Sequence, residues 1–230
     1  MKKVLAFVFS LSLLVVAMTN CSKPEEPEQP TGIVPEKVDL GLPSGLKWAN
    51  FNVGATREMD YGLFYQWGGV TAVTREGWDI YPWGSENALT KYCTDAAFGT
   101  VDNKTTLELA DDAAHVAYGG EWRMPTMNEA YELWSNCTRT WDSIGYVYGY
   151  RFTGPNGNSI FLPSNGWINE EGEIFGYSEQ GNYWTSSLHD RDNNNAYGLL
   201  TRTGDQTNEG VLTSHRGNRR FARGVRAVCP

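Results

Sequence analysis

The stretch from Gly119 to Trp134 constrains the fold of this chain more than any other segment. Thr126 precedes a run of good helix formers, so its hydroxyl is placed to accept a hydrogen bond from a free amide at a helix start. Glu129, three residues later, completes the pattern of a capping box. The sequence therefore predicts a helix that begins after Thr126. At helical spacing, its inward side comprises Ala130, Leu133, Trp134 and Cys137.

A second helix is predicted just upstream. Thr105 and Glu108 repeat the capping-box spacing, and the Gly119–Gly120 pair is typical of a helix end, because glycine adopts left-handed backbone angles at low cost. The acidic pair Asp111–Asp112 falls inside this segment. Adjacent helical residues point about 100° apart, so capping or solvation explains this pair better than shared acid–base chemistry.

The first twenty residues are interpreted as a signal peptide. Lys2 and Lys3 precede an apolar run, residues 4–18, that is shorter than the roughly twenty residues of a membrane span. Cys21 follows directly and resembles the lipidated cysteine of bacterial lipoproteins. The alternative is an ordinary cleaved signal with an incidental cysteine.

Residues 21–37 are rich in Pro and Glu, which predicts a solvated, extended tether. Its acidic run also resembles the surface-export signal of Bacteroidota lipoproteins, which implies an anchor in the outer membrane with the domain facing outward. The two interpretations of the run are compatible. The tether leaves residues 38–230 as a single domain of ordinary size.

Charge narrows the functional classes. Loss of Lys2 and Lys3 with the signal peptide leaves 17 basic and 27 acidic residues, a formal net charge of −10. Such a balance argues against non-specific binding of nucleic acid. Nine Trp, twelve Tyr and 25 Gly favour short strands and turns around aromatic packing over a helical bundle.

Three cysteines remain after Cys21, an odd number for an oxidising compartment, so at most one internal disulfide is expected and its partners stay open. They are Cys93, Cys137 and Cys229. No C-x-x-C pair occurs and the three histidines are scattered, which gives a zinc site little support.

Short apolar segments predict an antiparallel sheet. The clearest hairpin joins residues 147–153 and 159–162 through a Gly-Pro-Asn-Gly-Asn turn. Other strands are predicted at residues 38–52 (as strand, turn and strand), 61–67, 183–185, 196–202, 211–213 and 223–228. Residues 68–106 and 165–181 are expected to be long loops. Because helices come early and strands late, the predicted class is α+β.

Five separated segments resemble the Fibrobacter succinogenes major paralogous domain family of Bacteroidota surface lipoproteins. They are VDLGLPSGLKWAN from residue 38, DDAAHVAYGGEWRMPT from 111, GYRFTGPNGNSIFLP from 149, NYWTSSL from 182 and GVRAV from 224. That family resembles the C-type-lectin-like fold of formylglycine-generating enzymes. The resemblance implies two helices packed on a twisted antiparallel sheet, with the chain ends in neighbouring strands and long variable loops.

Catalysis is not expected. Formylglycine-generating enzymes use a cysteine pair near the C-terminal end of the domain, and this chain has no cysteine between Cys137 and Cys229. A G-x-S-x-G nucleophile motif is also missing from the sequence.

One segment has the spacing that opens calcium loops, at Asp190, Asp192 and Asn194. An EF-hand would need Gly at the sixth position and Glu at the twelfth, where Asn195 and Thr201 stand. A looser calcium site and a solvated polar turn are the two remaining interpretations.

Loop aromatics and C-terminal arginines are the candidate ligand contacts. Sugar rings stack on aromatic faces, and the loops offer Trp78, Tyr81, Trp83, Trp167 and Tyr177. A basic segment near the C-terminus adds Arg216, Arg219 and Arg220. The alternatives are that the aromatics are packed inside and that the arginine stems are buried with their heads paired to acids.

The sequence is most consistent with a non-catalytic, lipid-anchored surface module that binds a glycan or a surface or host protein. One alternative is a structural or accessory subunit of a surface appendage. A second is a metal-dependent enzyme built on the fold of formylglycine-generating enzymes.

Overall fold

The computed structural model describes residues 33–203 and 211–230, so the predicted signal peptide, Cys21 and most of the tether lie outside it. The helix predicted after Thr126 is present as α2, Met127–Asn136. Thr126 Oγ1 accepts from the Glu129 N–H at 3.3 Å, and Glu129 Oε2 accepts from the Thr126 N–H at 2.7 Å. The capping box is thus confirmed, and α2 buries Ala130 and Leu133 as expected.

The upstream helix is shorter than predicted. It is α1, Ala113–Tyr118, preceded by the 3₁₀ turn η2, Leu109–Asp111. Asp112 caps it by accepting from the N–H groups of residues 114 and 115. The expected start at Thr105 is wrong because that segment runs extended beside a later strand, with hydrogen bonds from Leu107 N–H to the Ser186 carbonyl and from Leu188 N–H to the Thr105 carbonyl.

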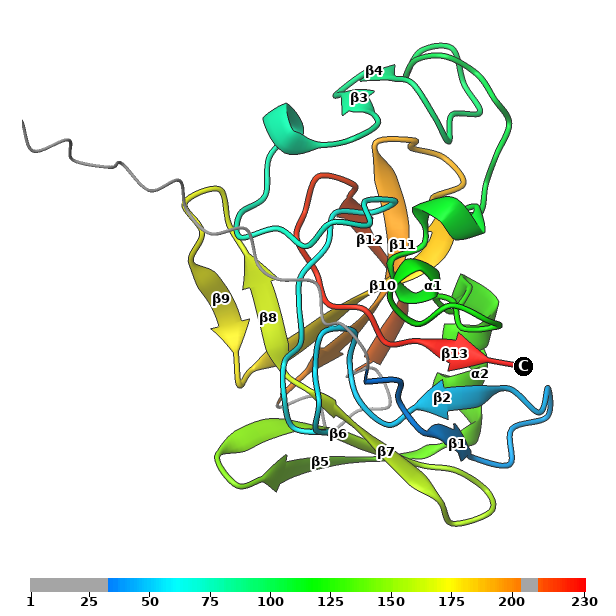
Figure 1. The fold of residues 1–230 in the computed structure, drawn as a ribbon, viewed down its shortest axis with the longest axis vertical. Helices are drawn as coiled ribbons and strands as arrows, with labels where there is room; N and C mark the ends of the chain where they lie inside the picture. Colours follow the sequence, from blue (N-terminus) through cyan, green and yellow to red (C-terminus); the bar gives the residue numbers. More distant parts are fainter. Residues whose placement is uncertain (1–32, 204–210) are drawn as a thin grey trace, which may run out of the picture.

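The largest sheet has five strands in the order β12-β11-β10-β8-β9 (Figure 1). Their bounds are β8 Asn165–Ile168, β9 Ile174–Tyr177, β10 Gln180–Leu188, β11 Asn195–Arg202 and β12 Val211–Asn218. All neighbours are antiparallel except β8 and β10, which meet in parallel at Gly166 and Gly181. The segment 165–181, expected to be a loop, is therefore mainly the β8–β9 hairpin. Helix α2 packs against β10, β11 and β12.

Two smaller sheets complete the framework. One joins β1 Lys37–Asp39, β2 Lys47–Ala49 and β13 Val228–Cys229, which brings the two ends of the domain together. The other joins β5 Thr138–Ile144, β6 Val147–Thr153 and β7 Ser159–Pro163. The predicted β6–β7 hairpin is confirmed, whereas β5 was not foreseen.

Two predicted strands are largely irregular. In residues 61–67 Tyr65 alone pairs, in an isolated bridge to Arg223. In residues 223–228 the regular strand is confined to the last residue. The reason is that residues 223–225 bond to several segments in turn, since Arg223 exchanges hydrogen bonds with Tyr65, Gly224 donates to Asn182, and Val225 accepts from Val53.

The long loop between Gly68 and Thr106 extends past the ends of β11 and β12 (Figure 1). It contains the 3₁₀ turn η1, Trp78–Ile80, and the small ladder of β3, Gly84–Ser85, and β4, Ala88–Leu89. Ala72 and Tyr92 from this loop are buried in the same core cluster as Trp67 and Trp184. The loop is therefore part of the packed domain.

The observed architecture is mostly β, with two short helices and several antiparallel sheets, which fits the α+β class. Cys93, Cys137 and Cys229 are buried and free, so these three form no disulfide with one another. Among the described residues, no helix is long and apolar enough to cross a membrane.

Candidate functional site

A buried arginine fixes the long loop to the sheet. Arg219, just after β12, is fully buried and its guanidinium carbon lies 4.7 Å from the centre of the Trp67 ring. Nε donates to the Tyr81 hydroxyl at 2.7 Å, while the terminal nitrogens donate to the carbonyls of Tyr92, Asn193 and Lys91 at 2.9–3.1 Å. Burial lowers the pKa of Arg219. We call this group the Arg219 clamp.

The clamp corrects two predicted ligand contacts. Tyr81 and Arg219 lie inside the fold, where their polar atoms bond to each other and to the main chain. The alternative of buried arginine stems describes Arg219 correctly, except that its head bonds to carbonyls and a hydroxyl where acids were expected. Arg216 is exposed on β12.

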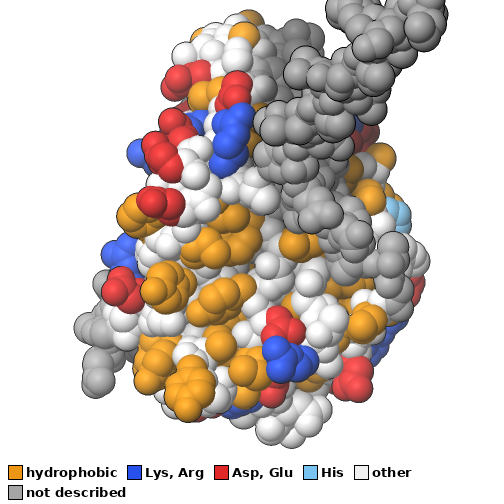
Figure 2. Space-filling view, turned by 60° about the vertical axis from the view of Figure 1, so that its left-hand side comes forward, with side chains coloured by type: hydrophobic (Ala, Val, Ile, Leu, Met, Phe, Trp, Pro, Cys, Tyr) orange, Lys and Arg blue, Asp and Glu red, His pale blue; other side chains and the backbone are white. Residues whose placement is uncertain are grey.

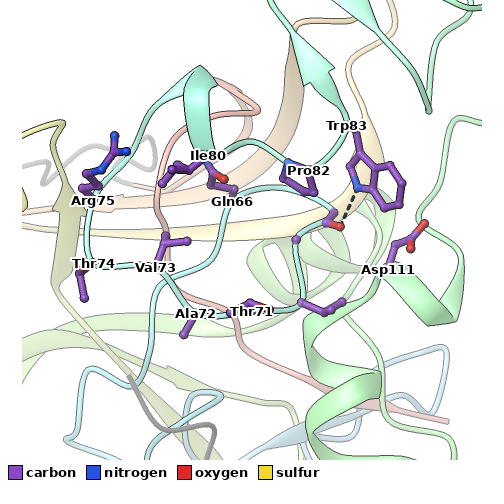
Figure 3. Close-up of a pocket in the computed structure, with 13 residues that line it drawn as sticks. Gln66, Thr71, Ala72, Val73, Thr74, Arg75, Ile80, Pro82, Trp83 and Asp111 are labelled. Atoms are coloured by element: carbon purple, nitrogen blue, oxygen red, sulfur yellow. Dashed lines mark hydrogen bonds between the residues drawn. The ribbon is translucent and has the colours of Figure 1, made fainter. Parts of the chain in front are cut away.

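Beside the clamp, the loop folds back on itself around a cavity of about 660 Å³, the loop cavity (Figure 3). Apolar side chains such as Val73, Ile80 and Pro82 share its wall with the hydroxyls of Thr71 and Thr74. The complete lining is Gln66, residues 68–75, Ile80, Pro82, Trp83 and Asp111. The cavity therefore offers an apolar body with a few polar groups, the usual composition of a ligand site.

The predicted contact Trp83 lines this cavity and is held in place. Its ring N–H donates to the Gly68 carbonyl at 2.8 Å (Figure 3), and the Lys91 ammonium lies 4.9 Å from its ring centre. Asp111, which the sequence marked only as part of an acid pair, accepts from both Lys91 and the Tyr92 hydroxyl. Burial, together with this carboxylate, raises the pKa of Tyr92 to about 12. Asp111 thus braces the cavity wall.

A second, polar depression of about 410 Å³ adjoins the cavity, and we call it the Glu76 hollow. Arg75 lines both spaces. The predicted contacts Trp78 and Arg220 meet here, although 142 residues separate them in the sequence. The hollow is lined by Arg75, Glu76, Gly77, Trp78, Asp79, Glu86, Glu170, Asn218 and Arg220.

Charged groups in this hollow are largely paired. Arg220 contacts the carboxylate of Glu170, and its Nη1 lies 3.6 Å from Glu76 Oε1. Arg75 and Asp79 form an ion pair of 2.5 Å at the rim. Burial raises the pKa of Glu76 to about 7, against the opposing effect of the Arg220 charge. Glu76 was missed because nothing in its local sequence separates it from a surface glutamate.

The other two predicted aromatics lie in different places. Trp167 lines a small hollow of about 260 Å³ beside Phe221. Tyr177 lines an open groove of about 680 Å³ between β5–β6 and β9, which we call the aromatic groove. Its other rings are Trp141, Tyr148 and Phe175.

Figure 2 shows hydrophobic side chains gathered on the side of the molecule that lies at the left in Figure 1, where β9 is located. Trp141 and Tyr148 are parallel to within 9° on one face of the β5–β6 hairpin. Aromatic residues stand at alternate positions near the turn at Gly145, and this pattern was the sequence signal that could have identified this face.

The predicted calcium ligands are engaged in hydrogen bonds within the protein. Asp190 accepts from the Tyr197 hydroxyl, and the two oxygens of Asp192 accept from Asn194 and Asn195. Asn194 exchanges two hydrogen bonds with Asn87 of the long loop. In the described part of the chain, no group of three His, Cys, Asp or Glu side chains is arranged to hold a metal ion. This turn therefore serves to dock the long loop.

No protein-family model, no curated protein and no solved structure matches this chain. What the molecule does is therefore inferred from its own residues. Two adjoining spaces, the loop cavity and the Glu76 hollow, gather three of the predicted contacts: Trp78, Trp83 and Arg220.

Proposed function

We propose that the protein is a non-catalytic surface module of C-type-lectin-like fold that binds a glycan or a surface or host protein in the loop cavity. Cys21 carries the lipid that anchors it to the outer membrane, and the Pro- and Glu-rich tether holds the domain away from the bilayer. Two short helices with several antiparallel sheets, and chain ends paired through β1, β2 and β13, are compatible with that fold.

The observation that carries the proposal is a cavity with a fixed wall. The Arg219 clamp and the Trp83 hydrogen bond hold the loop before any ligand arrives, so binding has little ordering entropy to overcome. Trp83 offers an aromatic face, and the exposed Thr71 and Thr74 offer hydroxyls. An amphipathic ligand such as a sugar or a protein side chain fits this combination.

Array binding of the mature protein (residues 21–230) tests the proposal. We expect hits on a broad glycan array or on a panel of surface and matrix proteins, and Trp83→Ala should weaken them at least tenfold. Trp141→Ala in the aromatic groove is the matched control and should leave them unchanged. Absence of any hit, or equal effects of the two substitutions, would contradict binding in the loop cavity.

The anchor has its own test. Metabolic labelling with a fatty acid should mark the wild-type protein, and Cys21→Ser should abolish both the label and recovery in the membrane fraction. Label retained on the Cys21→Ser protein would sink the anchor assignment.

The aromatic groove favours one alternative, a structural or accessory subunit of a surface appendage. Tyr148, Phe175 and Tyr177 are 45–59% exposed, and the nearby Tyr146 is 96% exposed. Exposed aromatic clusters of this kind are typical of protein contacts. If this role is the correct one, cross-linking on the parent cell surface will capture a partner through residue 148 and none through residue 83.

A further inference from the structure

The Glu76 hollow contains a buried carboxylate with one unused oxygen. The Glu76 side chain is 8% exposed, and its Oε1 faces Arg220 at 3.6 Å. Its Oε2 is buried and has no hydrogen-bond partner among the described residues. A buried, charged acceptor that lacks a hydrogen-bond donor costs more free energy than most single contacts contribute. Such a group therefore points to a ligand that supplies the donor.

The backbone around Glu76 is fixed and holds this side chain in the hollow. The Glu76 N–H donates to the Asn169 carbonyl at 3.1 Å, which ties it to the β8–β9 turn. Gly77 has φ of +152°, and a Cβ there would lie 2.4 Å from an Asp79 oxygen. Trp78 is held edge-to-face against the buried Tyr81, with ring centres 5.3 Å apart. The arrangement is therefore set before a ligand binds.

We propose that the Glu76 hollow is a binding site for a neutral sugar residue, in which Glu76 Oε2 accepts a hydrogen bond from a ring hydroxyl. The Trp78 ring packs against the C–H face of the sugar. Asn218 uses its Oδ1 to accept from the Arg220 N–H, which leaves its amide group as a donor to a second hydroxyl. The hollow is a second site beside the loop cavity, and it does not depend on what that cavity binds.

The lining of the hollow carries charges of both signs. It contains four carboxylates and two guanidinium groups, and Arg75 and Arg220 offset part of the negative charge in ion pairs with Asp79 and Glu170. Hydroxyls donate and accept equally well, which suits a lining of mixed sign. A neutral polyhydroxylated ring therefore satisfies Glu76 without disturbing the two ion pairs.

Ligand affinity in the hollow is expected to fall as pH falls. Burial raises the pKa of Glu76 to about 7; Arg220 and Arg223 act against this, and Glu170 and Glu171 add to it. The remaining charged groups at the hollow are Arg75, Asp79 and Glu86. Only the carboxylate form accepts at both oxygens, so affinity should fall, by up to about tenfold, as pH drops below about 7.

Saturation-transfer NMR on the mature protein tests the site with a panel of neutral methyl glycosides of glucose, galactose, mannose and N-acetylglucosamine. We expect at least one to bind with higher affinity at pH 8 than at pH 6. Glu76→Gln should weaken that binding about tenfold and remove its pH dependence, because the amide loses the charge-assisted bond. Glu121→Gln, the same change at an exposed glutamate that does not line the hollow, should alter affinity less than threefold.

Further variants separate this site from the loop cavity. Trp78→Ala should abolish glycoside binding even if Glu76→Gln perturbs folding, whereas Trp83→Ala should leave it intact. A panel with no binder overturns the proposal, as does preferential binding of ethanolammonium over the glycosides. Loss of glycoside binding in Trp83→Ala but not in Trp78→Ala would also overturn it and assign the sugar to the loop cavity.

Discussion

Two neighbouring arginines organise two different regions, the Arg219 clamp and the Glu76 hollow. Arg219 is fully buried. It donates hydrogen bonds to carbonyls and a hydroxyl and packs against aromatic faces, so its charge is stabilised by dipoles and aromatic rings. Arg220 is partly exposed and forms ion pairs with the carboxylates of Glu170 and Glu76. The first position holds the loop in place, and the second lines an open, charged hollow. The difference shows that neighbouring arginines of one basic cluster can divide into a buried structural residue and a partly exposed surface residue.

The largest predicted effect is on the clamp. Arg219→Leu leaves three main-chain carbonyls and a hydroxyl without their donor, and we expect a loss of about 4 kcal/mol in the free energy of unfolding. Urea denaturation measures it. Arg216→Leu, at an exposed position, is the control and should change stability by less than about 0.5 kcal/mol. Similar losses from both variants would break the comparison.

The second-largest predicted effect is a pH dependence of stability that arises from Glu76 in the hollow. Glu76 has a pKa of about 7 in the folded protein and an ordinary pKa of 4.5, so the folded state holds its proton more tightly. The contribution of Glu76 to stability is therefore full below pH 4.5 and is lost as pH rises to 7. The loss is on the order of 3 kcal/mol.

Thermal unfolding of wild type and Glu76→Gln between pH 4.5 and pH 7 isolates the contribution of Glu76, because all other carboxylates are common to both proteins. Glu76→Gln should gain in stability relative to wild type as pH rises from 4.5 to 7. A constant difference between the two proteins would show that Glu76 titrates normally.

A smaller effect separates the parts of the clamp. Tyr81→Phe removes the hydroxyl that accepts from Arg219 and donates to the Trp67 carbonyl. Since the other three bonds of Arg219 remain, we expect a loss of about 1–2 kcal/mol in the free energy of unfolding by urea. A loss as large as that of Arg219→Leu would mean that the clamp acts through this hydroxyl alone.

The smallest effect is expected at the rim of the hollow. Glu170→Gln breaks an ion pair whose acidic partner is 57% exposed, and such pairs contribute within about 0.5 kcal/mol. Chemical denaturation at low and high salt should show little change in either condition. A loss above about 1 kcal/mol would indicate that Glu170 helps to hold the loop.

The sequence by itself determined the elements whose contacts are local. The box at Thr126 and Glu129 spans three residues, and the turn between β6 and β7 is set by its own glycines, so both could be predicted. Residues 105–108 carry the same box pattern as α2, but their hydrogen bonds go to Ser186 and Leu188 far along the chain. Pairing with β10 decided their conformation, and local propensity did not.

The tertiary structure alone decided the candidate sites. Sequence reasoning found Trp78, Trp83 and Arg220 because aromatic and basic residues in loops are conspicuous, but it could not separate Arg219 from Arg220. Their environments depend on partners more than 100 residues away, among them Tyr81 for the first and Glu76 for the second. Burial is a property of the assembled fold, so the donor that Glu76 lacks became visible only once the loop, the β8–β9 turn and the C-terminal segment had come together.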